Sequence, residues 1–189
     1  TQGKPLPDIL RTIVDHVEQL NPAMLCSILL LDANSQRLGH GVAPSLPDFY
    51  NAAVEGLAIG LGVGSCGTAA FTGQRVVVDD IQTHPYWTAF RALAAQAQLG
   101  ACWSQPILAT SGQVLGTFAI YHRSPHVPQD ADITLIEQSA RLVSLAIERK
   151  QAEIQLAESE ARYRSLIELA HDGIVVVQHG DVQYSNPMM

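Results

Sequence analysis

One unbroken helical pattern limits what this chain can fold into more than any other feature. It begins at Asp130 and runs past residue 160 without a glycine or a proline. A helix of that length with no second apolar face usually needs a partner, because an isolated helix is only marginally stable in water. Apolar residues recur along it every seven positions, which is the spacing of a coiled coil. They are Ala140, Ile147, Ile154 and Ala161.

We therefore predict that residues 130–164 form a connecting helix through which two copies of the chain pair in parallel as a homodimer. A second row with the same spacing contains Lys150, so the pairing is expected to be weak. The alternative is that this helix folds back on its own domain and that the dimer forms elsewhere.

The residues before this helix predict a mixed α+β domain with a central, mainly antiparallel sheet flanked by helices. Apolar periodicity and turn residues delimit each element. Helices are expected over 7–20, 47–54, 68–71 and 87–99, and strands over 24–32, 37–42, 75–80, 101–109 and 114–122. The domain is expected to span residues 1–148, so its last helix is the beginning of the connecting helix.

The charge balance and the apolar runs exclude two classes of partner. The net charge is −7 with 11 Lys and Arg residues, whereas nucleic-acid binders draw most of their affinity from a basic face. The longest apolar runs, such as residues 28–31, have the length of a strand, and a bilayer requires roughly 20 apolar residues. We expect neither nucleic-acid binding nor membrane insertion.

The cysteines indicate a reducing compartment. The chain has three cysteines, Cys26, Cys66 and Cys102. Their number is odd, they are widely spaced, and no two of them form a Cys-x-x-Cys motif. Neither a zinc site nor a disulfide framework is therefore expected. The cytoplasm is the expected location, and no metal site is predicted.

Four segments carry a resemblance to a known family. They are residues 60–73 (GLGVGSCGTAAFTG), 76–81 (VVVDDI), 103–108 (WSQPIL) and 114–121 (VLGTFAIY). In this order, and with the predicted elements around them, they resemble the GAF domain family over roughly residues 8–148. The resemblance implies a sensory domain that binds a small molecule or a partner domain.

The tail, residues 165–189, resembles the start of a PAS domain. The motifs are residues 158–166 (ESEARYRSL), 172–174 (DGI) and 184–187 (YSNP). Two short strands cannot bury enough surface to be stable alone, so we expect the truncated N-terminal part of that domain. GAF followed by PAS is similar to the input half of bacterial signalling proteins, whose outputs are histidine kinases, diguanylate cyclases (GGDEF) or cyclic-di-GMP phosphodiesterases (EAL). None of those catalytic motifs is present, so no enzymatic activity is expected of this chain.

The glycine-rich segment predicts where a ligand would bind. Its glycines allow a tight turn, Thr68 begins a helix, and backbone N–H groups beside the Ser65 and Thr68 hydroxyls can bind a carboxylate or a phosphate. The more ordinary interpretation, which we favour, is a loop-to-helix connection that Ser65 caps. A ligand is expected between the sheet and residues 60–68, against Ser65, Cys66, Thr68 and Trp103. Trp103 fits core or dimer packing equally well.

Two other functions remain open. One is a thiol enzyme like the free methionine-R-sulfoxide reductases, which are single GAF domains. Cys66 matches one of their cysteines, but residues 84–90, where their nucleophile is expected, contain no thiol, which argues against this activity. The other is a domain that binds no ligand and serves only as a dimerisation scaffold.

The resemblance leaves the cofactor unknown. No cysteine precedes a histidine, so no covalent bilin is expected, and the family's cyclic-nucleotide signature is missing. Haem is not expected either, because the candidate histidines fit a polar helix face or loops beside prolines. They are His16, His84, His122 and His126.

Overall fold

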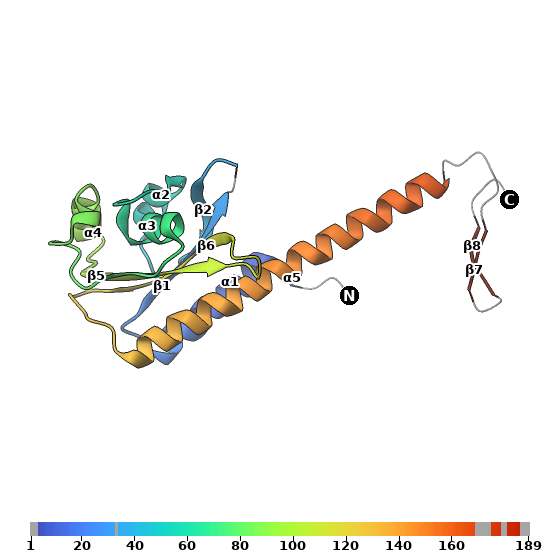
Figure 1. Cartoon of the computed structure of the whole chain (residues 1–189). Coiled ribbons are helices and arrows are strands. Elements are labelled where there is room, and N and C mark those ends of the chain that lie inside the picture. Colours follow the sequence, from blue (N-terminus) through green and yellow to red (C-terminus); the bar gives the residue numbers. More distant parts are fainter. Residues whose placement is uncertain (1–3, 33, 169–174, 179–180, 186–189) are drawn as a thin grey trace. The chain divides into compact units, whose positions relative to one another are not determined.

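The computed structural model describes residues 4–32, 34–168, 175–178 and 181–185, and it divides into two units, Thr1–Glu148 and Arg149–Met189. The elements of the first unit confirm the predicted α+β order (Figure 1). They are α1 (Leu6–Leu20), β1 (Leu25–Asp32), β2 (Arg37–Val42), α2 (Asp48–Val54), β3 (Leu57–Ala58), α3 (Gly64–Thr72), β4 (Val76–Val78), a 3-10 turn η1 (Pro85–Trp87), α4 (Arg91–Gln96), β5 (Ala101–Leu108), β6 (Val114–His122) and the beginning of α5 (Asp130–Glu168).

The six strands form one antiparallel sheet in the order β3-β2-β1-β6-β5-β4. Every described pair of neighbouring strands in it is antiparallel. The first strand pairs with the last, so β1 and β6 lie at the centre of the sheet. The predicted central antiparallel sheet is confirmed.

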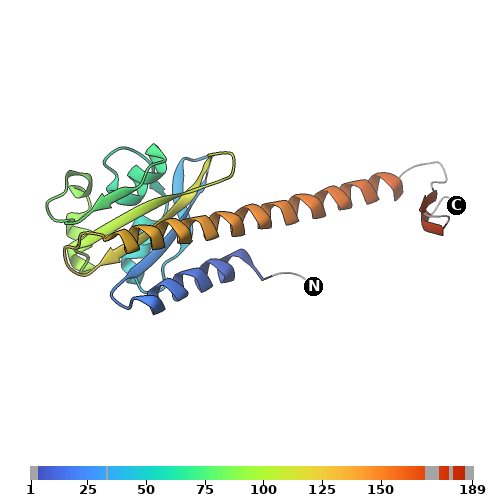
Figure 2. The same cartoon turned by 60° about the horizontal axis from the view of Figure 1, so that its bottom comes forward.

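Helices cover both faces of this sheet. α2, α3 and α4 lie on one face, and α1 and the beginning of α5 lie side by side on the other (Figures 1 and 2). Because side chains alternate along a strand, each strand supplies residues to two separate cores. One core contains Cys66, Cys102 and Tyr121, and the other contains Trp103, Ile120 and Ile136.

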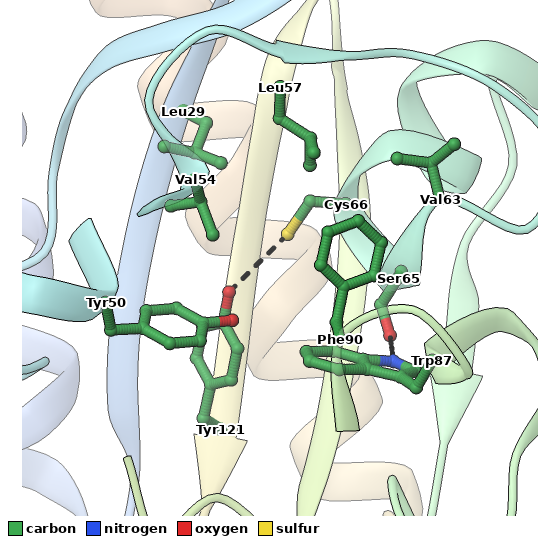
Figure 3. A pocket seen from close by; sticks show the side chains of 11 residues that line it. Leu29, Tyr50, Val54, Leu57, Val63, Ser65, Cys66, Trp87, Phe90 and Tyr121 are labelled. Carbon is green, nitrogen blue, oxygen red and sulfur yellow. Dashed lines mark hydrogen bonds between the residues drawn. The ribbon is translucent and has the colours of Figure 1, made fainter. Parts of the chain in front are cut away.

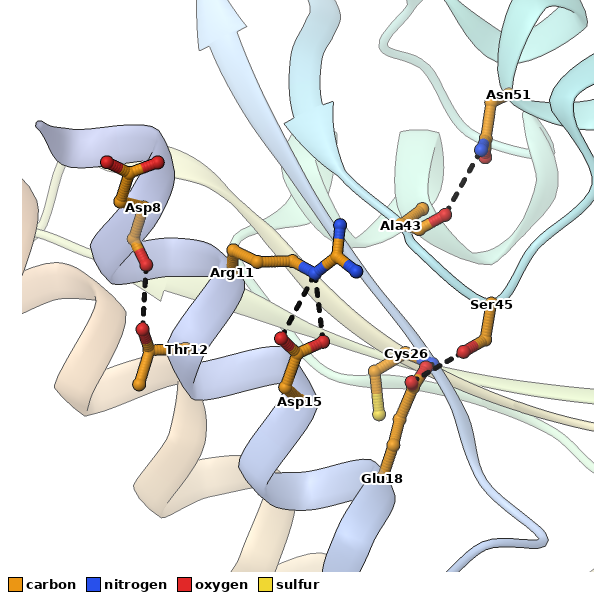
Figure 4. Close-up of polar contacts among 9 residues, drawn as sticks. All are labelled: Asp8, Arg11, Thr12, Asp15, Glu18, Cys26, Ala43, Ser45 and Asn51. Carbon is orange, nitrogen blue, oxygen red and sulfur yellow. Dashed lines mark hydrogen bonds and ion pairs between the residues drawn. The ribbon is translucent and has the colours of Figure 1, made fainter.

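α1 is held to the sheet by an apolar face and by one carboxylate. Leu10, Val14 and Val17 are buried at helical spacing. Glu18 accepts a hydrogen bond from the backbone N–H of Cys26 at 2.7 Å and another from the Ser45 hydroxyl at 2.6 Å (Figure 4). This one side chain therefore ties α1 to β1 and to the loop before α2.

α3 packs on the sheet through its first seven residues, which are all small or short and all buried. A Cβ atom at Gly67 would stand 2.9 Å from the Val63 side chain, so this position requires glycine. Gly73 ends the helix in the left-handed conformation, with φ 66°, and its N–H bonds to the carbonyl of Ala69.

Two helices differ from the sequence prediction, and the two-residue strand β3 was not predicted, whereas the five predicted strands agree to within two residues at each end. α3 begins at Gly64 rather than Thr68. The helix expected over 87–99 is instead the turn Pro85–Trp87 followed by the short α4, with Gln98 in the left-handed region at φ 55°. Local turn bonds, including Phe90 N–H to the Trp87 carbonyl at 2.8 Å, replace the regular helical pattern there.

The second unit contains the rest of α5 and an antiparallel pair of strands, β7 (Val175–Gln178) and β8 (Asp181–Ser185). The predicted motif at 172–174 and the last two residues of the motif at 184–187 lie outside the described residues. No helix in the described part of the chain combines the length and hydropathy that crossing a bilayer requires.

Candidate functional site

A small cavity lies between α3 and the sheet, and we call it the Cys66 cavity. Its volume is about 20 Å³, which is room for about one water molecule. Apolar, aromatic and thiol groups surround it, and no Asp, Glu, Lys or Arg is among the residues that line it (Figure 3). The lining residues are Leu29, Tyr50, Val54, Leu57, Val63, Gly64, Ser65, Cys66, Trp87, Phe90 and Tyr121.

The polar part of the cavity is a thiol and two phenols. Cys66 Sγ lies 3.7 Å from Tyr121 Oη, and the rings of Tyr50 and Tyr121 pack edge to face with centroids 6.0 Å apart. Burial raises the pKa of both tyrosines well above their usual value. Both phenols are therefore neutral hydrogen-bond donors in the physiological range.

Ser65 joins the aromatic wall to the sheet. Trp87 Nε1 donates to Ser65 Oγ at 3.0 Å, and Ser65 Oγ donates to the Cys102 carbonyl at 3.1 Å (Figure 3 shows the first bond). The prediction that Ser65 caps the helix is wrong, because α3 already begins at Gly64 and Ser65 lies inside it. The N-cap position is Val63, which makes no side-chain hydrogen bond. The Ser65 hydroxyl instead fixes η1 and β5 to α3.

Thr68 holds the glycine-rich loop and does not line the cavity. Its hydroxyl donates to the Gly64 carbonyl at 2.7 Å and accepts from the Gly62 N–H at 3.1 Å. The hydroxyls of Ser65 and Thr68, which could have bound an anion, are thus engaged inside the protein. Ser65 and Cys66 therefore both lie in the cavity wall, whereas Thr68 does not.

Trp103 lies on the opposite face of the sheet from the Cys66 cavity. Cys102 and Trp103 are adjacent in β5, so they point to opposite sides, and Trp103 belongs to the core beneath α1 and α5. Its ring packs against His122 and His126, which stack with centroids 4.3 Å apart. Its Nε1 donates to the His126 carbonyl at 3.2 Å. Trp103 therefore anchors the segment that leads into α5.

The residues predicted to pair two copies of α5 divide into two groups. Ala140 and Ile147 are each 4% exposed and pack in the core of their own domain. Ile154 is 50% exposed, and Ala161 is exposed as well. The first two cannot meet a partner helix without leaving the sheet, so the predicted row does not form one continuous surface.

Sequence reasoning missed the aromatic residues of the cavity, Tyr50, Trp87, Phe90 and Tyr121. Cys102 and Tyr121 are opposite each other in β5 and β6, so strand alternation predicts that they share a face of the sheet. Alternation does not predict which face carries a cavity. Among the described residues, no group of three or more His, Cys, Asp or Glu side chains is placed to hold a metal ion.

Comparisons with known proteins agree with this geometry. A family model described as GAF domain matches residues 3–148. The methyl sulfide methyltransferase-associated sensor of Methanosarcina acetivorans is 36% identical over 182 residues, which is 96% of this chain and 18% of that protein. This chain thus spans less than a fifth of the length of that relative.

Two solved structures share the fold. A domain of a protein described as a two-component sensor histidine kinase from Sinorhizobium meliloti superposes with a TM-score of 0.68 at 20% identity, covering 82% of this chain and 99% of that one. The free methionine-R-sulfoxide reductase of Neisseria meningitidis, in complex with its substrate, gives a TM-score of 0.60 at 19% identity, covering 78% and 81%. At these identities the likeness shows the fold alone.

Proposed function

Because this chain belongs to the GAF domain family through residues 3–148, we propose that it is a non-catalytic sensory module that binds a small uncharged molecule in the Cys66 cavity. The observation that supports this most is the lining itself. Apolar walls, two neutral phenols and the absence of Asp, Glu, Lys and Arg from the lining favour an uncharged ligand, since a buried charge without a partner is strongly unfavourable. The relative named as a sensor is consistent with such a role.

The cavity volume of about 20 Å³ sets a condition on the ligand. A molecule larger than water enters only if the lining moves. The glycine-rich loop is the segment best placed to do so, because Val63 and Gly64 line the cavity. Its movement would break the bond from the Gly62 N–H to the Thr68 hydroxyl. We infer that a ligand displaces this loop when it binds.

Native mass spectrometry of freshly purified protein tests the sensing proposal. The wild type is expected to retain extra mass, and Leu57→Trp, which fills the cavity, is expected to lose it. Leu108→Trp is the matched control, because Leu108 lies outside the cavity and is 40% exposed. If neither the wild type nor the control retains extra mass, the ligand-free scaffold becomes the better description.

We propose that α5 carries the signal. Ser144 Oγ donates to the Leu108 carbonyl at 2.6 Å, and the Glu148 carboxylate accepts from the N–H and hydroxyl of Thr110 at 2.9 and 3.0 Å. These bonds attach α5 to the end of β5, whose other end contacts Ser65 at the cavity. A shift of α3 therefore has a direct route to α5 through one strand.

The remaining parts of the proposal concern the whole signalling protein. We propose that residues 165–189 begin a PAS domain, that the output is a histidine kinase or a GGDEF/EAL domain, and that the protein works in the cytoplasm. Expression of a longer chain that includes the output domain would test this, with output activity measured for the wild type and for Leu57→Trp. Equal activities under all conditions would argue against a sensory role.

We also propose a homodimer, with its contact moved to the other side of α5. Exposed apolar side chains recur there at seven-residue spacing, interrupted by Arg149. They are Leu142 (56% exposed), Leu156 (62%) and Tyr163 (65%), with Leu145 (56%) three positions after the first. This spacing fits a second copy of the same helix.

A thiol enzyme remains the second candidate, because the Cys66 thiol does line the cavity. Residues 84–90 contain no second thiol, so we expect no reduction of free methionine sulfoxide. Turnover by the wild type that disappears in Cys66→Ser would reverse this conclusion.

A further inference from the structure

Cys66 packs in the core on the face of the sheet that carries Ala119 and Tyr121, with its sulfur 3.7 Å from Tyr121 Oη. On that face, Ala119 has Thr117 and Tyr121 as neighbours along β6, and the strand register places Ser104 and Ser27 opposite it on the two adjoining strands. Burial is complete or nearly so for all of these residues. The thiol is thus surrounded by hydroxyl groups rather than by hydrocarbon alone.

Three of those hydroxyls have no hydrogen-bond partner of their own. Ser27 Oγ, Ser104 Oγ and Thr117 Oγ1 are buried and unpaired. An unpaired buried hydroxyl costs free energy, roughly 1–3 kcal/mol. A hydroxyl beside a sulfur can recover part of that cost by donating to a thiolate, so this surrounding favours the charged form of Cys66.

A second thiol faces the first. Cys102 lies in β5 in the same core as Cys66, and the hydroxyl of Ser65, the residue before Cys66, donates to the Cys102 carbonyl at 3.1 Å. Hydrogen bonding with the Cys102 side chain, followed by that with the nearby hydroxyls, lowers the pKa of Cys66 despite its burial. Burial, followed by the contact with Cys66, raises the pKa of Cys102. The pair therefore consists of one thiol that ionises readily and one that keeps its proton.

The Cys66 cavity gives this pair access to a small reagent. The thiol lines a space of about 20 Å³, which admits one molecule about the size of water. Hydrogen peroxide is uncharged and only slightly larger than water, so a small displacement of the lining is enough to admit it. The Tyr121 hydroxyl, 3.7 Å from the sulfur, is placed to donate to a departing hydroxide.

We propose that Cys66 and Cys102 form a two-thiol site that hydrogen peroxide oxidises to an intramolecular disulfide. In the first step, the Cys66 sulfur attacks one peroxide oxygen, the O–O bond breaks, and hydroxide leaves and takes up the proton that Cys66 released. In the second step, the Cys102 sulfur attacks the Cys66 sulfenic acid, the S–O bond breaks, and water leaves with the Cys102 proton. Two thiols and one peroxide thus yield one disulfide and two waters.

This site requires no reversibly bound ligand, so it can hold or fail independently of the sensing proposal. Counting thiols on the wild-type protein provides the test. Protein is treated with a few equivalents of hydrogen peroxide, the excess is removed with catalase, and the remaining thiols are alkylated with N-ethylmaleimide in denaturant. Intact mass is expected to fall from three alkylated cysteines to one, and peptide mapping should link Cys66 to Cys102 within one chain.

Cys26 is the matched internal control. It is buried on the opposite face of the sheet, where burial and the nearby Glu18 raise its pKa. Cys26 should therefore keep its thiol during the peroxide treatment and be alkylated afterwards. Cys26→Ser should form the same disulfide as the wild type, and Cys66→Ser should keep both remaining thiols. Three alkylated cysteines after treatment, a bridge that includes Cys26, or Cys66 oxidised with Cys102 still free would each overturn the proposal.

Discussion

His122 is 5% exposed, stacks on His126, and has its Nε2 buried without a hydrogen-bond partner. Burial, and after it the neighbouring His126, lowers the pKa of His122 to about 4, whereas Asp132 opposes this shift. The imidazole is therefore a neutral core residue at physiological pH. A proton there would place a charge between Trp103 and His126 at the beginning of α5.

This residue makes stability depend on pH in a defined window. The unfolded chain takes up the His122 proton as the pH falls through about 6.5, and the folded chain takes it up only near 4. The free energy of unfolding should therefore fall by about 2–3 kcal/mol between these pH values. Urea unfolding of the wild type and of His122→Gln at pH 7, 5.5 and 4 measures this, and the variant should lose less. Parallel losses in both proteins would assign the effect to other groups.

The sequence predicts some of the residues of the site, but not the face of the sheet on which each one lies. The motif around Gly64 indicated Ser65 and Cys66, and both reach the cavity. Trp103 was predicted beside them because alternation along a strand fixes only which residues share a face, not which face bears the cavity. Tyr50 and Phe90 come from segments far apart in sequence, and only the folded chain brings them together.

At the level of elements, the strands were predicted well because each is a short apolar run bounded by turn residues. The start of α3 was missed because glycine is a poor helix former, whereas here close packing against the Val63 side chain requires glycine at position 67. Tertiary contact thus outweighs local preference. The end of the same helix was predicted, since Gly73 is the left-handed residue that commonly closes a helix.

The closing glycine of α3 gives a clean stability prediction. A Cβ at Gly73 would meet only the Val114 side chain at an ordinary 3.9 Å, so the cost of Gly73→Ala is conformational, about 1 kcal/mol. Asn tolerates the left-handed region better, so Gly73→Asn should cost less than Gly73→Ala. Thermal unfolding of both variants checks the order, and equal losses would show that the backbone angle is not the cause.

The exposed face of α5 predicts which substitutions separate the dimer. Leu142→Glu with Leu156→Glu places charges in the proposed seam and should give a folded monomer in sedimentation. The matched control is Ile154→Glu with Ala161→Glu, from the row first predicted, which should leave the dimer intact. A monomer from the control pair alone would place the contact on the side of Ile154 and Ala161, and a monomeric wild type at micromolar concentration would exclude α5 as the contact.

Across the whole first unit, the sheet is the layer that both cores share. The Cys66 cavity lies on one face and α5 on the other, and β5 and β6 contribute to both. Removing the Trp87 donor with Trp87→Phe should leave Ser65 less firmly held and should raise hydrogen exchange at the Thr110–Glu148 contact as well as in α3. Leu61→Ala, at a 66% exposed loop position, is the control. Faster exchange confined to α3 would mean that the sheet does not transmit the change.

The central pairing of the sheet also bears on how the chain assembles during synthesis. β1 has β6 as its partner, with Leu25 opposite Tyr121, so almost the whole of the sheet-forming sequence separates the two. The hairpin of β1 and β2 therefore keeps the β1 edge unpaired until β6 has left the ribosome. Folding dominated by such distant contacts is slow, and an open apolar edge invites wrong pairing. Pieces of this domain that end before residue 122 should therefore aggregate, and refolding should be limited by closure of this last strand.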